Sequence, residues 1–117
     1  MLLLENFPTI RKIEEMTREQ ITKIIRAHEA ELRGAGVESL SLVGSVARGE
    51  ATDASDVDVL VRLAPDAARS GFAYFARLEV LAQLLRDFIG RPVDVIAEPV
   101  RGDHLRHSID KDAVLAF

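Results

Sequence analysis

The sequence predicts a small α/β domain, in which one small mixed sheet is packed against helices. Three short runs are rich in β-branched and other apolar residues, at 37–43, 56–63 and 92–97. They alternate with two longer segments, residues 17–34 and 72–89, whose apolar residues recur at the spacing of a helix. Such alternation along a chain is typical of sheets whose strands are connected by helices.

Length and composition indicate one domain. At 117 residues, with 48% apolar and 29% charged side chains, the chain is long enough to bury a single core. We expect residues 1–16 to form an N-terminal arm and residues 17–117 to form the domain. The chain contains no cysteine, which excludes disulfides and thiolate metal sites.

Charge and hydropathy exclude other classes of protein. The formal net charge is −4 without any block of lysine or arginine, whereas a general nucleic-acid binder needs a basic surface. The first residues lack the pattern of a secretory signal, and no apolar run reaches the ~18 residues of a membrane span. We therefore expect a soluble cytoplasmic protein that binds neither membranes nor nucleic acid in general.

The first predicted helix begins after Thr17. Thr17 and Gln20 have the spacing of a capping box, in which each side chain bonds to the backbone N–H of the other residue. His28 lies on or beside the apolar stripe that follows, and we expect it to be buried or at the boundary between core and solvent. The helix is predicted to end near Gly34.

Two strands are predicted in the middle of the chain. Residues 37–43 form the first strand, which is bounded by glycines. A short helix over residues 45–49 and a loop over residues 50–54 lead to the second strand at 56–63. Residues 65–71 form the connection to the next helix.

The longest predicted helix covers residues 72–89. Its apolar residues, Phe75 among them, recur at helical spacing, and we expect this stripe to face the core. Gly90 and Pro92 end the helix, because glycine favours the position after a helix and proline cannot continue it.

The last part of the chain predicts a third strand at 92–97 and a helical tail at 100–107. Asp94 lies within this strand and shares a face with Ile96. Residues 112–117 form a short apolar segment, which we expect to pack against the core or against a partner.

Two carboxylates in the second strand indicate a metal site. Asp56 and Asp58 are two residues apart, so their side chains lie on one face of the strand. Two carboxylates about 5 Å apart repel by roughly 3 kcal/mol at an effective dielectric constant of about 20. Mg²⁺ removes this repulsion, because it prefers oxygen ligands and keeps positions open for substrate phosphates.

Gly44 and Ser45 lie where the first strand meets the short helix. A glycine there allows the backbone to approach a phosphate, and the amide N–H groups at a helix start favour negative charge. The Ser45 hydroxyl can add a hydrogen bond to a phosphate oxygen. Together with the carboxylate pair, these residues predict a site for a nucleoside triphosphate and a metal ion.

The segment resembles the signature of the nucleotidyltransferase superfamily of DNA polymerase beta type. Gly44 and Ser45 are followed, after the ten residues 46–55, by Asp56-Val57-Asp58. The fuller motif is most similar to the minimal nucleotidyltransferases, the small antitoxin partners of HEPN-domain toxins. This resemblance implies a single nucleotidyltransferase domain with the polymerase beta-like fold.

The resemblance also implies roles for individual residues. Asp56 and Asp58 would hold one or two Mg²⁺ ions, and a third carboxylate, mapped to Asp94, would complete the second metal position near the attacking hydroxyl. Gly44 and Ser45 would bind the β- and γ-phosphates of ATP.

Arg48 is a further candidate ligand of the nucleotide. It follows Ser45 by three residues, and two roles are open for it. It either reaches a phosphate, or it pairs with Asp53 or Asp56 and braces the loop.

The family implies both an activity and a partner. Its members transfer AMP from ATP to a tyrosine of a HEPN toxin and so silence the RNase activity of that toxin. We therefore expect a protein adenylyltransferase in a hetero-oligomeric complex with a HEPN-domain toxin. Two alternatives stay open: an antitoxin that acts by contact without catalysis, and a nucleotidyltransferase for small molecules such as antibiotics.

Overall fold

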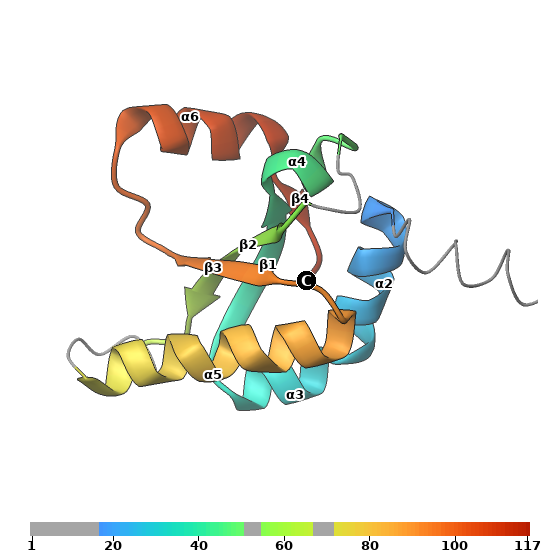
Figure 1. Ribbon diagram of the computed structural model, residues 1–117. Helices are drawn as coiled ribbons and strands as arrows, with labels where there is room; N and C mark the ends of the chain where they lie inside the picture. Colours follow the sequence, from blue (N-terminus) through green and yellow to red (C-terminus); the bar gives the residue numbers. More distant parts are fainter. Residues whose placement is uncertain (1–16, 51–54, 67–71) are drawn as a thin grey trace, which may run out of the picture.

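The computed structural model describes residues 17–50, 55–66 and 72–117, and it confirms the predicted α/β class. At its centre is a four-stranded mixed sheet in the order β3-β2-β1-β4 (Figure 1). The pairs β1–β2 and β1–β4 are antiparallel, and the pair β2–β3 is parallel. The strands are β1 (Val37–Val43), β2 (Val57–Leu63), β3 (Val93–Ala97) and β4 (Val114–Leu115).

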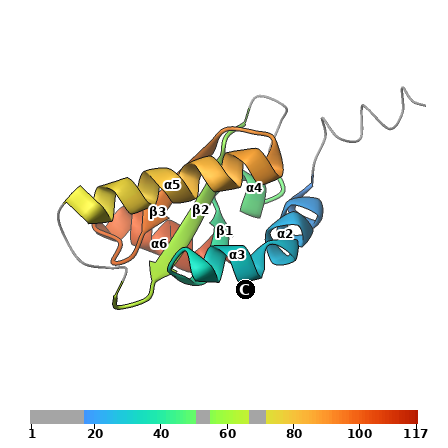
Figure 2. The same cartoon turned by 90° about the horizontal axis from the view of Figure 1, so that it is seen from below.

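Helices cover both faces of this sheet. Helices α2 (Arg18–Ala27), α3 (Glu29–Gly34) and α5 (Phe72–Ile89) lie on one side, and α6 (Asp103–Asp112) lies on the other (Figures 1 and 2). The short helix α4 (Gly44–Ala47) follows β1 and contacts β2 and α6. Within the described residues, no helix is both long and apolar enough to span a membrane.

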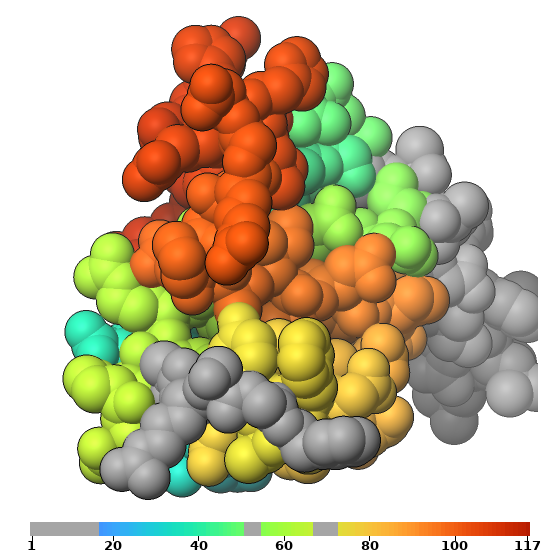
Figure 3. All heavy atoms as spheres, turned by 90° about the vertical axis from the view of Figure 1, so that its left-hand side faces the viewer, coloured from blue at the N-terminus to red at the C-terminus, as the bar shows by residue number. Residues whose placement is uncertain are grey.

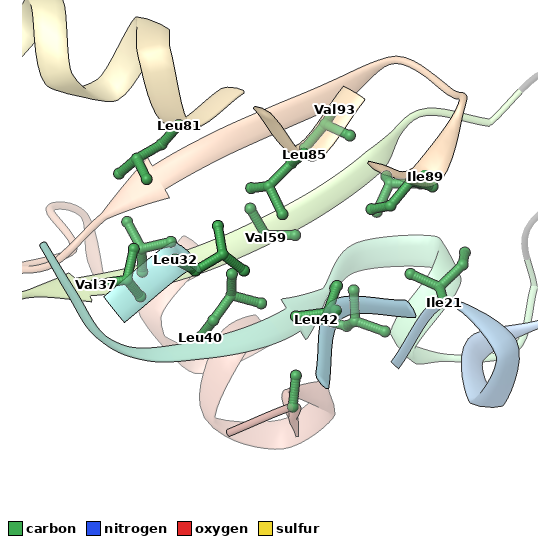
Figure 4. Packing of buried hydrophobic residues seen from close by; sticks show 14 of the residues in the cluster. Ile21, Leu32, Val37, Leu40, Leu42, Val59, Leu81, Leu85, Ile89 and Val93 are labelled. Carbon is green, nitrogen blue, oxygen red and sulfur yellow. The ribbon is translucent and has the colours of Figure 1, made fainter. Parts of the chain in front are cut away.

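The main core lies between the sheet and helices α2, α3 and α5. Figure 4 shows side chains of the strands and of these helices pointing toward one another in this layer. A smaller cluster on the opposite face joins Val43, Leu60 and Ile109 beneath α6. The fully buried side chains of the main core include Ile21, Ile25, Leu32, Leu40, Leu42, Val59, Leu81 and Leu85.

The first helical segment contains two helices where the sequence predicts one. The capping box at Thr17 and Gln20 is present, which confirms the predicted start. The chain then turns at His28, whose N–H donates to the carbonyl of Ile25 at 3.0 Å and ends α2. The His28 ring stacks on the ring of Phe88, with centroids 3.7 Å apart, and this contact with α5 holds the turn at the expected boundary of the core.

Helix α5 has the predicted bounds, but its core-facing stripe is shorter than predicted. Leu81, Leu85 and Ile89 are buried, whereas Phe75 is 66% exposed, so the expectation that Phe75 faces the core is wrong. An 18-residue helix is about 27 Å long, and a five-residue strand spans only about 17 Å. The first turns of α5 therefore extend past β3.

The C-terminal part differs from the prediction in two ways. Gly102, at φ +94°, turns the chain before α6, so this helix begins and ends later than the predicted 100–107. The predicted apolar segment at 112–117 contains a strand, β4, which pairs with Ser41 and Leu42 of β1. It packs on its own domain, and Ala116 is buried.

Three predicted segments fall wholly or largely outside the described residues. They are the arm at 1–16, most of the loop at 50–54 and most of the connection at 65–71.

Candidate functional site

Two of the three predicted carboxylates lie side by side on the sheet. Asp58 in β2 is the register partner of Val43 at the end of β1 and of Asp94 in β3. Residues directly opposite each other in neighbouring strands share a face of the sheet. The order across that face is therefore the end of β1 with Gly44, then Asp58, then Asp94.

Asp56 lies one residue before the observed start of β2, and its side chain is exposed. The next residue, Val57, donates its N–H to the carbonyl of Pro92 at 2.9 Å, which fixes this end of β2 beside β3. Arg91 adds a second link, because its guanidinium donates to the Ser55 carbonyl at 2.8 Å. The backbone at Asp56 is thus held directly before the first residue of β2.

The pKa of the Asp58 carboxyl is raised above its usual value of 3.8. Burial is the largest cause, and the negative charges of Asp94 and then Asp56 add to it, while the charge of Arg48 opposes it. The negative charges of two acidic groups therefore act on Asp58 at this end of the sheet. Such a cluster favours a bound cation, because a cation stabilises the ionised form of every member.

The donor chemistry of this cluster fits Mg²⁺, which takes carboxylate oxygens as ligands. Among the described residues, no three acidic or histidine side chains already surround a common point as a finished metal site would require. The carboxylates are therefore near enough to interact, but they are not yet arranged as a set of ligands.

The absence of a side chain at Gly44 leaves room for the carboxylate of Asp58. Its φ of +72° lies in the region that favours glycine. A Cβ atom at this position would lie only 2.5 Å from Oδ2 of Asp58, so the carboxylate would have to shift to admit a side chain. The sequence predicts that Gly44 makes room for a phosphate, and this stays a prediction; what the structure shows is that Gly44 makes room for the Asp58 carboxylate.

Helix α4 holds Ser45 beside this contact. Ser45 is half-buried in the first turn, where backbone N–H groups have no partner within the helix. The position of α4 is fixed from outside by Arg18, whose Nη1 donates to the carbonyl of Ala47 at 2.7 Å. The sequence pattern does not reveal this contact, because the two residues are 29 positions apart.

Arg48 forms ion pairs that the sequence analysis missed. Its Nε lies 2.7 Å from Oε1 of Glu50, and its Nη1 lies 3.7 Å from Oδ2 of Asp112 at the end of α6. It does not pair with Asp56, and Asp53 is outside the described residues. The spacing of Arg48 and Glu50 is a local signal, whereas nothing in the sequence links Arg48 to Asp112.

Two hollows lie beside strands β2 and β3, and one of them is lined in part by a site carboxylate. One, of about 420 Å³, lies between the sheet and α6, and its lining includes Leu60, which follows Asp58 on the same face. The other, of about 550 Å³, lies between α5 and β3, and Asp94 forms part of its wall. Space for ligands is therefore available along β2 and outward from β3.

Comparison with known proteins gives consistent results. The model of the family described as nucleotidyltransferase domain matches residues 12–114. A Methanocaldococcus jannaschii protein, provisionally named protein adenylyltransferase MJ1379, is 32% identical over 84% of this chain and 96% of its own length. Protein adenylyltransferase MntA of Thermococcus cleftensis is 49% identical over a shorter region, 39% of this chain and 48% of that protein.

Solved structures show the same architecture. A minimal nucleotidyltransferase, so described provisionally, superposes with a TM-score of 0.67 at 27% identity, over 85% of this chain and 95% of its own. The complex of a tri-AMPylated Shewanella oneidensis HEPN toxin with an MNT antitoxin contains a chain with a TM-score of 0.56 and 16% identity. That match covers 82% of this chain and 71% of the other, and it concerns the fold alone.

Proposed function

The chain belongs to the nucleotidyltransferase domain family, and on this basis we propose that it transfers AMP from ATP to a tyrosine of a HEPN-domain toxin. It is then an antitoxin that binds its toxin in a hetero-oligomeric complex and acts in the cytoplasm. Support comes from the relatives named protein adenylyltransferases, and from the solved complex in which an AMPylated HEPN toxin accompanies an MNT antitoxin.

The observation that carries this proposal is the contact between Gly44 and Asp58. It brings a helix start suited to phosphates directly against a carboxylate suited to a cation. Asp94, in register with Asp58, adds a second carboxylate on the far side. A protein that only binds a partner gains nothing from a cluster that raises the pKa of Asp58.

In the proposed reaction, different residues bind the phosphates, supply positive charge and bind the metal ion. Gly44 and Ser45 bind the β- and γ-phosphates, and Arg48 supplies positive charge at the same end of the sheet. Asp56 and Asp58, with Asp94, would hold Mg²⁺, which would supply positive charge to the phosphate oxygens and the departing pyrophosphate. The remaining task is to orient the acceptor and to remove its proton.

The transfer is an in-line displacement at the α-phosphorus of ATP. The acceptor oxygen forms a bond to that phosphorus, the bond to the oxygen bridging to the β-phosphorus breaks, and pyrophosphate leaves. Asp94 lies on the other side of Asp58 from Gly44 in the sheet, so we assign it as the base that accepts the proton of the acceptor hydroxyl.

The test is to incubate the purified protein with Mg²⁺, α-labelled ATP and a HEPN-domain protein encoded beside it, and to locate the label by mass spectrometry. We expect the label on a tyrosine of the HEPN-domain protein. It should disappear when the Asp56→Ala/Asp58→Ala double variant replaces the protein, and when a chelator removes the metal ion.

The alternatives give different results. If the double variant still neutralises the toxin and no label is transferred, the protein acts by contact alone. If the label appears only on an added aminoglycoside or another small hydroxyl compound, the acceptor is not a protein.

A further inference from the structure

The face of the sheet that carries the carboxylates continues beneath α6. Leu60 follows Asp58 on this face of β2, Ile96 follows Asp94 in β3, and Leu60 and Ile96 are register partners. Two residues along a strand span about 7 Å, so this second row of side chains lies next to the carboxylates. In Figure 3 the red residues of α6 lie above the orange residues of β3, and the yellow residues of α5 lie below them, in agreement with the positions of the two helices on opposite faces of the sheet.

A hollow of about 420 Å³ opens beside this second row, between the sheet and α6. Its volume is within the range of about 300–1,000 Å³ that is typical of sites for small molecules. Leu60, Val100 and Ile109 form its apolar part, and they belong to the smaller hydrophobic cluster beneath α6. The hollow therefore has an apolar floor that begins at Leu60, the next residue on the carboxylate face of β2 after Asp58.

The charged groups around the hollow balance one another. Arg62 and Arg106 supply two positive charges, and Glu98 and Asp110 supply two negative charges. Nε of Arg62 donates to Oε2 of Glu98 at 2.7 Å, so these two side chains are already paired. A balanced lining does not favour a further phosphate, which requires an excess of positive charge. It suits an uncharged ligand with polar edges, such as a nucleoside.

The geometry of the proposed reaction sets the direction in which the nucleoside extends. In an in-line displacement the attacking and leaving oxygens lie on one line through the phosphorus, and the other oxygens lie around its equator. This line runs across the strands, because Gly44, on the phosphate side, and Asp94, on the acceptor side, flank Asp58. The nucleoside is attached through an equatorial oxygen, so it extends roughly at right angles to the line.

Along the sheet, two directions are at right angles to this line. One leads from Asp58 to Asp56, which lies before the first residue of β2 and is assigned to the metal ion. The other leads from Asp58 to Leu60 and into the hollow. The second direction offers the apolar floor and the enclosing wall of α6 that a nucleoside requires.

We propose that the nucleoside of ATP binds in this hollow, with its base over Leu60 and with the guanidinium of Arg106 against the ring. The inference rests on the proposed function, because it locates the other half of the nucleotide whose phosphates are assigned to Gly44 and Ser45. Guanidinium groups stack on flat rings, and Arg106 is an exposed residue of α6 that can adjust to one. In this arrangement α6 recognises the nucleoside, while the turn at Gly44 recognises the phosphates.

The first test compares ATP with inorganic triphosphate, which has the phosphates but no nucleoside. In the presence of Mg²⁺, we expect Arg106→Ala to weaken the binding of ATP about 5-fold or more and to change that of inorganic triphosphate less than about twofold. Arg101→Ala is the matched control, since Arg101 is also exposed and carries the same charge but does not line the hollow. It should change both affinities, measured by calorimetric titration, less than about twofold.

A second measurement locates the base directly. An ATP derivative with an azido group on its base is irradiated together with the wild type and Mg²⁺, and it labels the residues nearest to the base. We expect the label within residues 60–62 and 98–110, identified by mass spectrometry after digestion. An excess of ATP should suppress it.

The results separate this inference from the proposed function, because neither measurement requires the HEPN-domain protein. If AMP is transferred to that protein but the photolabel lies elsewhere, or if the two Ala variants bind ATP equally, the inference is wrong and the proposed function stands. If the photolabel lies in the hollow and only Arg106→Ala weakens ATP binding, the inference holds even when no AMP reaches the HEPN-domain protein. If the wild type binds neither ATP nor inorganic triphosphate, both fail.

Discussion

On one face of β2 the side chains of Val57, Val59 and Val61 are all completely buried, and they pack against the helices of the main core. On the other face of the same strand, Asp58 is half-buried and Arg62 is exposed and paired with Glu98 at 2.7 Å. The two sets alternate along seven residues. One strand thus belongs to the core on one face and to the candidate site on the other.

The difference between the two faces is energetic as well as spatial. Burial of the valines stabilises the fold, at about 25 cal/mol for each Å² of apolar surface removed from water. The raised pKa of Asp58 means that its ionised form is less favourable in the folded protein than in the unfolded chain. Burial on the core face therefore offsets the unfavourable ionisation of Asp58 on the site face. Substitutions on the core face should mainly change stability, and substitutions on the site face should mainly change activity.

The largest effect is expected from Asp58→Asn. The change keeps the shape of the side chain but removes a charged ligand, so we expect AMP transfer to fall by about 10³-fold while the protein stays folded. Labelled ATP and a HEPN-domain protein measure the transfer, and circular dichroism measures the fold. Asp66→Asn, at an exposed position away from the cluster, is the control and should retain full activity.

On the core face we expect a substitution to lower stability and to leave activity unchanged. Leu85 is completely buried against the sheet, and Leu85→Ala should lower the free energy of unfolding by about 3 kcal/mol through the lost apolar contact and the cavity that remains. Activity per folded molecule should be unchanged. Val80→Ala on the exposed side of the same helix should cost less than about 0.5 kcal/mol in a urea titration.

The features that the sequence predicted well depend on local patterns. The bounds of β1 and α5 follow from apolar periodicity and from the glycines and proline that end each segment. The neighbourhood of Gly44 and Asp58 follows from a short motif within two adjacent strands. In each case a short stretch of the sequence is enough to predict the feature.

The features that it missed depend on residues far apart in the chain. The turn at His28 is held by the ring of Phe88, and the two-residue strand β4 exists because β1 offers it a partner. The ion pair of Arg48 with Asp112 joins the end of α4 to the end of α6, and no pattern in the sequence predicts it. Such contacts arise only when the helices have packed on the sheet.

A smaller effect is expected where the two faces meet, at Gly44. Gly44→Ala places a Cβ at φ +72° and against Oδ2 of Asp58, so the loss of stability combines backbone strain with displacement of the carboxylate. Gly90→Ala is the matched control, because Gly90 has φ +76° and an added Cβ meets no atom within 4 Å.

We expect Gly90→Ala to cost about 1–2 kcal/mol for the left-handed conformation alone. Gly44→Ala should cost at least about 1 kcal/mol more and reduce AMP transfer about 10-fold or more, since Asp58 must move. Urea titrations and the labelled-ATP assay measure the two quantities. Equal stability losses and an unchanged rate for Gly44→Ala would show that the contact with Asp58 is unimportant.

The smallest effect is the dependence of stability on pH. Because the pKa of Asp58 is raised above 3.8 in the folded protein, the native state binds more protons than the unfolded chain just above that value. Stability should therefore fall as the pH rises through this window, and this contribution is absent in Asp58→Asn. The variant should melt above the wild type at neutral pH, with the difference vanishing below the unfolded pKa. Mg²⁺ should reduce the neutral-pH difference, because it stabilises the ionised carboxylates of the wild type more than those of the variant. A difference in melting temperature that is the same at every pH would mean that Asp58 ionises as it does in the unfolded chain.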